Sequence, residues 1–496
     1  GWQGVTEEGE TFPAQLPATL PKPPFKKKKP FTEDGVELKA WKMDALPYLV
    51  YAPIKKQPKE KEIIRSLKNL AKKADSIIIA TDFDREGELI GSDALFCIQE
   101  VNPDAPVQRA RYSAFTKEEI THAFDNLVEL DVNLASAGAS RQDIDLIWGA
   151  VLTRYLTCVK YSGIGNTRSA GRVQTPTLAL VVEREKERDA FIPEDYWVIT
   201  GNAAPKGEHD DAFVATHATA RFKDKNEADG VMARIANASE ATVGTIEKKR
   251  RKSNPPAPFN TTSLMAAASS IGIKPARTMR IAESLYMNGY TSYPRVDNTV
   301  YPDNLDLREV LNILAKVPDF REGAEALLAK GKLTATRGKQ ETTDHPPIYP
   351  TGAADPDKLR PEEWKLYSLI CRRFMATLSE AATLESTKVT LDVAGEPFTA
   401  RGDVLVDPGY RSVYPYGLKK DEQMPPLAEG QVLDFWDADC AHKQTEPPAR
   451  FSSGKLVQEM EAKGLGTKAT RHDMIERLYS RHYIVNDPIE PTQLGI

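Results

Sequence analysis

The apolar positions between residues 63 and 98 change from helical spacing to a continuous run and back. Residues 77–80 form a short apolar run, which is typical of a strand in a buried parallel sheet. Apolar side chains recur at helical spacing before this run, in residues 63–71, and after it, in residues 89–98. A helix, a strand and a helix in this order predict an α/β layer.

Two further stretches, residues 196–245 and 386–438, alternate between polar and apolar side chains, as the strands of a half-buried sheet do. They flank a long segment in which the spacing is helical. Because two β segments far apart in the sequence bracket a helical insert, we expect them to form one discontinuous β domain.

Helical spacing dominates three other parts of the chain. Residues 131–195 are mainly helical, and residues 256–380 contain a helix that begins near Thr261 and another that ends at Gly289. The last part predicts a helix, a glycine turn and a second helix, with Thr470 and Asp473 at the spacing of a capping box. Such a pair either places a helix N-terminus against phosphates or forms a plain packed hairpin, and the pattern fits both.

The size and composition indicate several domains with real hydrophobic cores. The chain has 496 residues, 41% of them hydrophobic, and about three or four domains are expected for such a length. Cys97, Cys158, Cys371 and Cys440 are scattered without a Cys-x-x-Cys pair, which argues against a disulfide framework and against a zinc ribbon in this chain. No apolar run approaches the ~20 residues of a membrane-spanning helix, so we expect no membrane contact and a reducing cytoplasm as the setting.

The net charge of −5 does not by itself indicate a nucleic-acid-binding protein. Binding to DNA requires local basic grooves, because affinity follows the charges near the phosphates and not the sum over the chain. Residues 26–29 and 248–252 are uninterrupted runs of lysine and arginine. Each run fits a DNA contact and equally fits a solvated charged face.

Tyr293 and Arg295 follow the helix that ends at Gly289 and are candidates for attack on a phosphodiester. A phenol with a pKa of about 10 is a weak nucleophile at neutral pH. A guanidinium beside it can lower that pKa and stabilise the charge that builds on the phosphoryl oxygens. A tyrosine at the end of an element also fits plain packing.

Asp82, Asp84 and Glu86 come directly after the predicted strand of residues 77–80. Ligand sites of α/β sheets lie at the carboxyl ends of the strands, and three carboxylates crowded there repel one another unless a hard cation lies between them. Mg²⁺ meets this requirement, because it binds through one or two carboxylates and keeps several waters. An acidic turn that caps the next helix is the alternative.

Together these segments resemble those of type IA DNA topoisomerases, and most of all the archaeal topoisomerase I/III branch. Residues 81–88 are similar to the second acidic motif of a Toprim domain, and the segment around Tyr293 is similar to the active-site segment of the family. Residues 169–176, 344–348 and 464–471 are similar to its strand-binding motif, its histidine segment and its late glycine–threonine turn. These motifs follow the family order over most of the chain.

The resemblance implies a multidomain α/β + α + β fold, in which a Toprim α/β domain, helical winged-helix or CAP-like domains and a discontinuous β arch form a torus. We expect a Toprim-like domain in residues 1–130 and the tyrosine-bearing helical domain in residues 256–380. A helical strand-binding domain and the arch are each expected in two parts, residues 131–195 with 446–496 and residues 196–255 with 381–445.

The resemblance also implies roles for single residues. Tyr293 is the nucleophile, Arg295 stabilises the developing charge, and His345 donates to a phosphate oxygen. The alternatives are a solvated histidine and, for Arg141 with Asp145, an ordinary surface ion pair at i and i+4. The implied Mg²⁺ ligands are Asp82, Asp84 and Glu86, and the implied DNA contacts are Arg141, Asp145, Arg154, Ser169, Gly171, Arg172, Gln174, Thr291, Asp297 and Thr470.

The two ends of the chain depart from the family pattern. Residues 1–30 are rich in proline and lysine, which predicts an extended linker. The Toprim domain of the family opens with a strand that ends in a Glu-Lys pair. No such strand is found here, so the glutamate that would protonate the leaving oxygen has no match. The family usually continues beyond the point that corresponds to residue 496, and we expect a chain truncated at both ends.

These features predict an isomerase that cleaves, passes and rejoins single DNA strands through a 5′-phosphotyrosyl intermediate and relaxes negative supercoils without ATP. The absence of a Gly-x-x-x-x-Gly-Lys-Ser/Thr loop agrees with ATP independence. Two other classes stay open: another Toprim enzyme, such as a primase or nuclease, and a catalytically impaired fragment that binds single-stranded DNA. We expect a monomer at the nucleoid in the cytoplasm, with single-stranded regions of negatively supercoiled DNA as the partner and a helicase as a further candidate.

Overall fold

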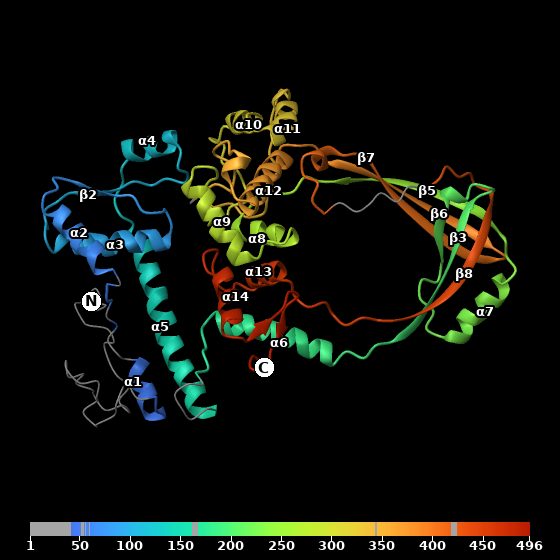
Figure 1. Cartoon of the computed structure of the whole chain (residues 1–496), viewed down its shortest axis with the longest axis horizontal. Coiled ribbons are helices and arrows are strands. Elements are labelled where there is room, and N and C mark those ends of the chain that lie inside the picture. The colour runs from blue at the N-terminus through green and yellow to red at the C-terminus, as the bar shows by residue number, and fades with distance from the viewer. Residues whose placement is uncertain are drawn as a thin grey trace.

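The computed structural model describes residues 41–160, 167–342, 345–417 and 424–496, apart from residues 51–53, 55 and 59 (Figure 1). The proline-rich tract of residues 1–30, its lysine run and Asp344 lie outside the described residues.

The α/β layer at the N-terminal side has the predicted order. η1 Met43–Ala45, α1 Leu46–Val50 and α2 Lys61–Ala71 are followed by β1 Ile77–Ile79 and α3 Arg85–Gln99. β1 pairs in parallel with β2 Val107–Arg109, and α4 Lys117–Asp125 comes next. Asp82, Asp84 and Glu86 therefore lie between the carboxyl end of β1 and the first turn of α3, as predicted.

The apolar run of β1 is less buried than the sequence predicts. Ile79 is 6% exposed, but Ile78 is 39% exposed. The predicted apolar faces of α2 and α3 also leave Ile63, Leu70 and Ile90 at the surface. Among the described residues, β2 is the only strand that pairs with β1. The described residues also leave uncovered the face of this two-stranded sheet that carries Ile78.

Helices from two distant parts of the chain form one body. α6 Gln174–Asp189 comes from the predicted helical segment, and α13 Ser453–Ala462 and α14 Arg471–Ser480 come from the end of the chain. The other helix of the predicted segment, α5 Val132–Lys160, packs mainly against α3 of the α/β layer. α6, α13 and α14 share a core with Val181, Leu456 and Leu478. A hairpin of β9 Ile484–Val485 and β10 Glu490–Pro491 follows α14, so the described C-terminal part is a helix–turn–helix with a wing.

The turn between α13 and α14 is built differently from the prediction. Gly464 and Gly466 have φ angles of 65° and 70°, which glycine adopts without steric cost. Thr470 is the N-cap residue of α14, but its side chain makes no capping hydrogen bond. Its hydroxyl oxygen accepts instead from the Thr467 N–H at 3.1 Å. The predicted capping box of Thr470 and Asp473 is therefore wrong, because the Thr470 hydroxyl oxygen accepts a hydrogen bond from the preceding loop and not from the first turn of α14.

The tyrosine-bearing part is helical, as predicted. It contains α8 Thr261–Ser270, α9 Pro275–Met287, α10 Leu307–Ala315, α11 Pro318–Leu328, η3 Pro356–Lys358 and α12 Pro361–Thr377. Asn260, one residue before the predicted start, caps α8 through the N–H of Ser263. Gly289 follows α9 with a φ of 73°. The helix therefore ends where predicted, and the backbone changes direction before it reaches Tyr293.

Six strands form a closed barrel with the order β3-β4-β7-β6-β5-β8. β3 Asp195–Pro205, β4 Phe213–His217 and β5 Glu240–Ser253 come from the first β segment, and β6 Ala382–Val393, β7 Glu396–Asp407 and β8 Val432–Gln444 from the second. Short η2 His209–Asp211 and η4 Gly409–Ser412 join strands, and α7 Lys225–Ile235, which was not predicted, packs on the barrel. The discontinuous β arch is thereby confirmed.

The barrel and the helical body are joined by two arms (Figure 1). One arm consists of the long ends of β5, β6 and β7, and the other runs from α6 into β3 and from β8 back to α13. The ribbon therefore traces a ring, with the α/β layer of β1 and β2 at the side opposite to the barrel (Figure 1). No helix of the described residues is long and apolar enough to cross a membrane.

Candidate active site

Tyr293 lies at the contact between the tyrosine-bearing helices and the α/β layer and is 3% exposed. Its hydroxyl donates a hydrogen bond to the Asp84 carboxylate. Its backbone N–H donates to the Ser113 carbonyl at 2.9 Å. The phenol ring centroid lies 4.7 Å from that of His345 and 5.3 Å from that of Tyr286. The phenol and the acidic motif, far apart in the sequence, thus form one site.

The electrostatic environment of Tyr293 differs from the expectation. Burial, and then the negative charge of Asp84, raise the pKa of the phenol above its usual value, and the opposite effect of Arg295 is smaller. Arg295 is engaged elsewhere: its NH2 group donates to Glu283 at 2.6 Å, and its NH1 group lies 3.7 Å from a Glu86 oxygen. Arg295 thus lowers the pKa of Tyr293, as expected, but burial and Asp84 outweigh it and the net shift of this pKa is upward.

The three predicted metal ligands do not converge. Asp82 accepts from the Tyr286 hydroxyl at 3.3 Å, and Asp84 also accepts from the Gly87 N–H at 2.8 Å as the cap of α3. Glu86 lies 3.5 Å from the guanidinium of Arg141. Among the described residues no group of three or more acidic, histidine or cysteine side chains could hold a metal ion. Asp84 therefore caps α3, as the alternative predicts, and the three-carboxylate metal set stays a prediction.

Asp82 and Asp84 still have the chemistry of a divalent-metal pair. Burial and then the charge of Asp84 raise the pKa of Asp82, which shows that the two carboxylates repel each other. Hard oxygen donors at the end of a strand suit a hard cation. The donor set thus fits a metal through Asp82 and Asp84, while Glu86 faces the guanidinium groups of Arg141 and Arg295.

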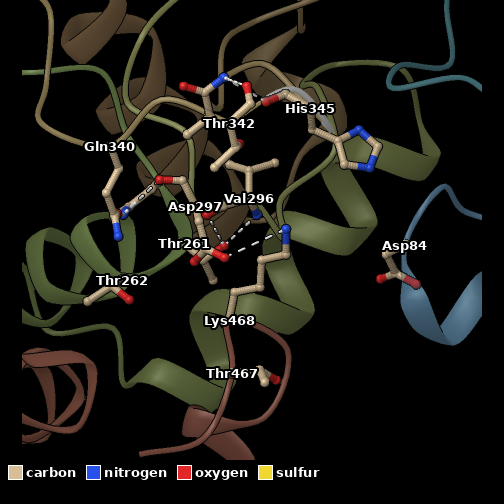
Figure 2. Close-up of polar contacts among 12 residues, drawn as sticks. Asp84, Thr261, Thr262, Val296, Asp297, Gln340, Thr342, His345, Thr467 and Lys468 are labelled. Atoms are coloured by element: carbon tan, nitrogen blue, oxygen red, sulfur yellow. Dashed lines mark hydrogen bonds and ion pairs between the residues drawn. The ribbon is translucent and has the colours of Figure 1, made fainter. Parts of the chain in front are cut away.

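His345 is held between the two parts of the site and is 2% exposed, so the alternative of a solvated histidine is wrong. Its Nδ1 lies 2.7 Å from the Ser113 hydroxyl oxygen, and its Nε2 contacts the Phe83 carbonyl. The Asn298 amide donates to the His345 carbonyl at 3.0 Å and so fixes its backbone. Figure 2 shows His345 facing the ribbon that carries Asp84.

A cavity of about 460 Å³ lies between α5, α6 and α14. Eight of the residues that were predicted to contact DNA line it, together with Arg477 and Arg481, which were not predicted. Arg172 donates to Asp145 at 2.9 Å, and Arg141 lies 3.8 Å from the same carboxylate, so Asp145 orients two arginines. The eight predicted residues are Arg141, Asp145, Arg154, Ser169, Gly171, Arg172, Gln174 and Thr470.

A second cavity of about 270 Å³ lies between the acidic motif and the turn before α14. Arg141 lines both cavities, and Asp84, Asp297 and Lys468 line the second. The Lys468 ammonium lies 3.8 Å from the Asp297 carboxylate (Figure 2). Arg141 therefore lies between the arginine-lined cavity and the cavity that contains Asp84, the carboxylate bonded by the phenol.

Thr291 does not reach this surface. It is fully buried and forms a bridge with Pro350, and its hydroxyl oxygen has no hydrogen-bond partner among the described residues. Thr291 is therefore not placed to contact DNA, contrary to the prediction. The backbone that positions Tyr293 directs the Thr291 side chain into the core.

Several residues of the site could not be identified from the sequence. Tyr286 carried only the signal of a buried helix face, although its hydroxyl also reaches Asp82. Glu283 lies one turn before it and holds Arg295. Ser113 follows β2 in a loop without a recognisable motif. Their roles depend on contacts between distant segments, for which a single sequence has no pattern.

The comparisons with known proteins agree with this geometry. Residues 129–496 match a family model described as DNA topoisomerase, and residues 22–115 match one described as Toprim domain. A DNA topoisomerase 1 from Archaeoglobus fulgidus is 44% identical over 92% of this chain and 67% of its own length.

The chain belongs to the type IA DNA topoisomerases.

Relatives of this topoisomerase family are found well beyond Archaeoglobus. The DNA topoisomerase 1 of Thermoplasma acidophilum is 39% identical over 92% of the chain and 58% of its own length, and the human DNA topoisomerase 3-beta-1 is 31% identical over 92% and 54%. The crystal structure of full-length topoisomerase I from Thermotoga maritima has a TM-score of 0.71 at 27% identity and covers 89% of this chain and 73% of that one. The chain thus spans about half to two thirds of the length of these curated topoisomerases.

Proposed function

We propose that this chain cleaves and rejoins single DNA strands by transesterification and passes a second strand through the break. The observation that carries the proposal is the position of Tyr293, whose hydroxyl bonds Asp84 of the Toprim layer. Asp84 lines a cavity that shares Arg141 with the arginine-lined groove. A buried phenol in plain packing would not need a carboxylate from another domain. The topoisomerases among its relatives support the same reaction.

In the proposed reaction the Tyr293 oxygen attacks the phosphorus of a strand that lies in the groove. The phenol proton passes to the Asp84 carboxylate and from there to solvent water. The bond from phosphorus to the 3′ oxygen breaks, and that oxygen takes a proton from solvent water and leaves as a 3′ hydroxyl. Arg295, released in part from Glu283, stabilises the charge on the phosphoryl oxygens. The bond energy stays in the phosphotyrosine, so rejoining requires no ATP.

Asp82 and Asp84 are the proposed holders of Mg²⁺, since Toprim domains bind divalent metal ions. Such an ion supplies a positive charge that positions phosphate oxygens. The other groups of the site act without it: His345 and Arg172 orient the strand, and Glu86 holds the two guanidinium groups of Arg141 and Arg295.

The proposed substrate is the single-stranded part of negatively supercoiled DNA, and relaxation of those supercoils is the proposed net result. We further propose that the chain acts as a monomer at the nucleoid and that a helicase is a candidate partner. Another Toprim chemistry, such as a nuclease or primase, requires no tyrosine at the acidic motif.

The test is covalent capture with Tyr293→Phe as the matched variant, since this change removes only the attacking oxygen. A single-stranded oligonucleotide labelled at its 3′ end is mixed with the protein and quenched with detergent. The label is expected on the wild-type protein and absent from the variant, because the phenol keeps the 5′ phosphate of the labelled fragment. Free labelled cleavage product with both proteins would identify a nuclease and sink the proposal.

Removal of the metal tests the second part of the proposal. Treatment with EDTA is expected to abolish rejoining of the captured strand, and Mg²⁺ is expected to restore it with wild type but not with Asp82→Asn. The readout is the fraction of adduct that returns to full-length oligonucleotide after high salt is added. Rejoining that is unaffected by EDTA would contradict the metal role of Asp82 and Asp84.

A further inference from the structure

Ser113 uses every polar group it has to hold the active site. Its N–H donates to Glu119 Oε1 at 3.0 Å, its carbonyl accepts from the Tyr293 N–H at 2.9 Å, and its hydroxyl lies 2.7 Å from His345 Nδ1. Glu119 belongs to α4 of the Toprim side, so this anchor fixes Ser113 to one domain. Tyr293 and His345 belong to the other. A single serine thus connects both catalytic segments to the Toprim layer.

The partners of His345 determine the tautomer of its ring. The Phe83 carbonyl can only accept a hydrogen bond, so the Nε2 that contacts it carries the proton. In the neutral ring Nδ1 is then an acceptor, and the Ser113 hydroxyl is its donor. Without that donor the ring could rotate or change tautomer, and Nε2–H would no longer point toward Phe83 and the neighbouring Asp82 and Asp84.

We propose that Ser113 is a positioning residue of the cleavage reaction, which keeps the Nε2–H of His345 aimed at the place of the scissile phosphate and keeps the Tyr293 backbone against the Toprim layer. The inference rests on the proposed function and adds a residue to it. In the structure the Nε2–H of His345 donates to the Phe83 carbonyl. In the proposed complex a phosphate oxygen replaces this carbonyl as the acceptor, while the Ser113 hydroxyl still donates to Nδ1.

The alternative is a purely structural contact between two domains. Ser113 is half-buried and its backbone hydrogen bonds do not depend on the side chain, so Ser113→Ala removes only the hydroxyl. Ser113→Thr keeps a hydroxyl and is the conservative variant. Ser270→Ala is the matched control, because its exposed hydroxyl bonds only the Ala267 carbonyl of its own helix, at 2.6 Å.

The experiment measures single-turnover cleavage of a 3′-labelled oligonucleotide by adduct formation, together with oligonucleotide binding. Ser113→Ala is expected to slow cleavage on the order of tenfold, as displaced catalytic groups do, and to leave binding within about twofold. Ser113→Thr restores the rate, and Ser270→Ala equals wild type. In the double-mutant cycle, adding Ser113→Ala to His345→Ala has no further effect, because both changes remove the same function.

Two results would overturn the inference: a Ser113→Ala rate equal to wild type, or a loss that adds in full to that of His345→Ala. A readout independent of cleavage is the ¹⁵N spectrum of histidine-labelled protein, with His345 assigned through His345→Gln. Wild type is expected to show the Nε2–H tautomer at His345 and Ser113→Ala to show a shifted or mixed tautomer. Failure of wild type to form any adduct would contradict the proposed function, and an unchanged His345 spectrum in Ser113→Ala would separately contradict this inference.

Discussion

At the scale of single residues, the site depends on groups that hold one another in fixed directions. Gly87 shows how tight this packing is, because a Cβ there would lie 1.9 Å from the Asp82 carbonyl oxygen. Arg109 is fully buried, and its NH2 group donates to the same carbonyl at 2.9 Å while its Nε donates to Glu88 at 3.1 Å. The backbone of the acidic motif is therefore fixed before any strand or metal binds.

Arg295→Ala is expected to reduce the rate of adduct formation by roughly 10²–10³, because a single group that stabilises an oxyanion contributes this much. Binding of the oligonucleotide is expected to change far less, since the groove supplies its own arginines. Single-turnover cleavage beside an equilibrium binding assay measures the two effects. Arg337→Ala, which removes an exposed guanidinium paired with Glu341, serves as the control, and a cleavage rate unchanged by Arg295→Ala would remove Arg295 from the mechanism.

At the scale of elements, what could be predicted from the sequence depends on local repetition. The spacing of Met279, Ala282 and Leu285 predicts a buried helix face, and all three side chains are buried. The alternation in residues 387–393 predicts a strand of the arch, and Val389, Leu391 and Val393 are buried there. The closure of six strands into a barrel could not be predicted, because the pairing of β3 with β8 joins segments that no local pattern connects.

The predicted site shows the same division. The order of β1, the acidic turn and α3 places Asp84 correctly, since it depends on neighbours in the sequence. The burial of Thr291 depends on its bridge with Pro350, and the ion pair of Glu86 depends on Arg141. Both partners lie in other segments of the chain. Motifs in the sequence thus identify the residues of the site, and tertiary contacts decide which of them face the groove.

Glu363 connects two helices of the tyrosine-bearing part and makes its stability depend on pH. It accepts hydrogen bonds from the Arg360 side chain at 2.6 Å and from the Ser284 hydroxyl of α9 at 3.2 Å. The Arg360 hydrogen bond outweighs burial and lowers the pKa of Glu363 from 4.5 to about 2. The folded protein thus binds this proton more weakly than the unfolded chain, so the stabilisation is complete above pH 4.5 and is lost as the pH falls toward 2.

Glu363→Gln is accordingly expected to cost about 1–2 kcal/mol at neutral pH, and this difference from wild type should shrink as the pH is lowered from 5 to 2. Urea unfolding at several pH values, followed by tryptophan fluorescence, measures it. Glu325→Gln, which removes an exposed carboxylate of α11, is the matched control. A Glu363→Gln penalty that stays constant down to low pH would show that the carboxylate charge does not stabilise the fold.

At the scale of the whole molecule, the distribution of charge matters more than its sum. The chain carries a net charge of −5, yet five arginines line the groove between α5, α6 and α14: Arg141, Arg154, Arg172, Arg477 and Arg481. The basic run of residues 248–252 is exposed on β5 and partly neutralised, since Arg250 donates to Glu385 at 2.8 Å and Arg251 lies 3.6 Å from Asp403. The groove is therefore the expected place of phosphate contact, and the β5 run fits a solvated face.

Binding of single-stranded DNA should then fall steeply with salt despite the net negative charge. Each phosphate contact adds about −0.7 to the slope of log K against log salt for single strands, so removal of one contact is expected to flatten the slope by about that amount. Arg477→Ala in a Tyr293→Phe background, which cannot cleave, isolates this effect, and Arg251→Ala on β5 is the matched comparison. A flatter slope with Arg477→Ala and an unchanged one with Arg251→Ala would place the strand in the groove. The reverse result would move the strand to the arch, and the arginines around Asp145 would then serve to hold α5 against α6.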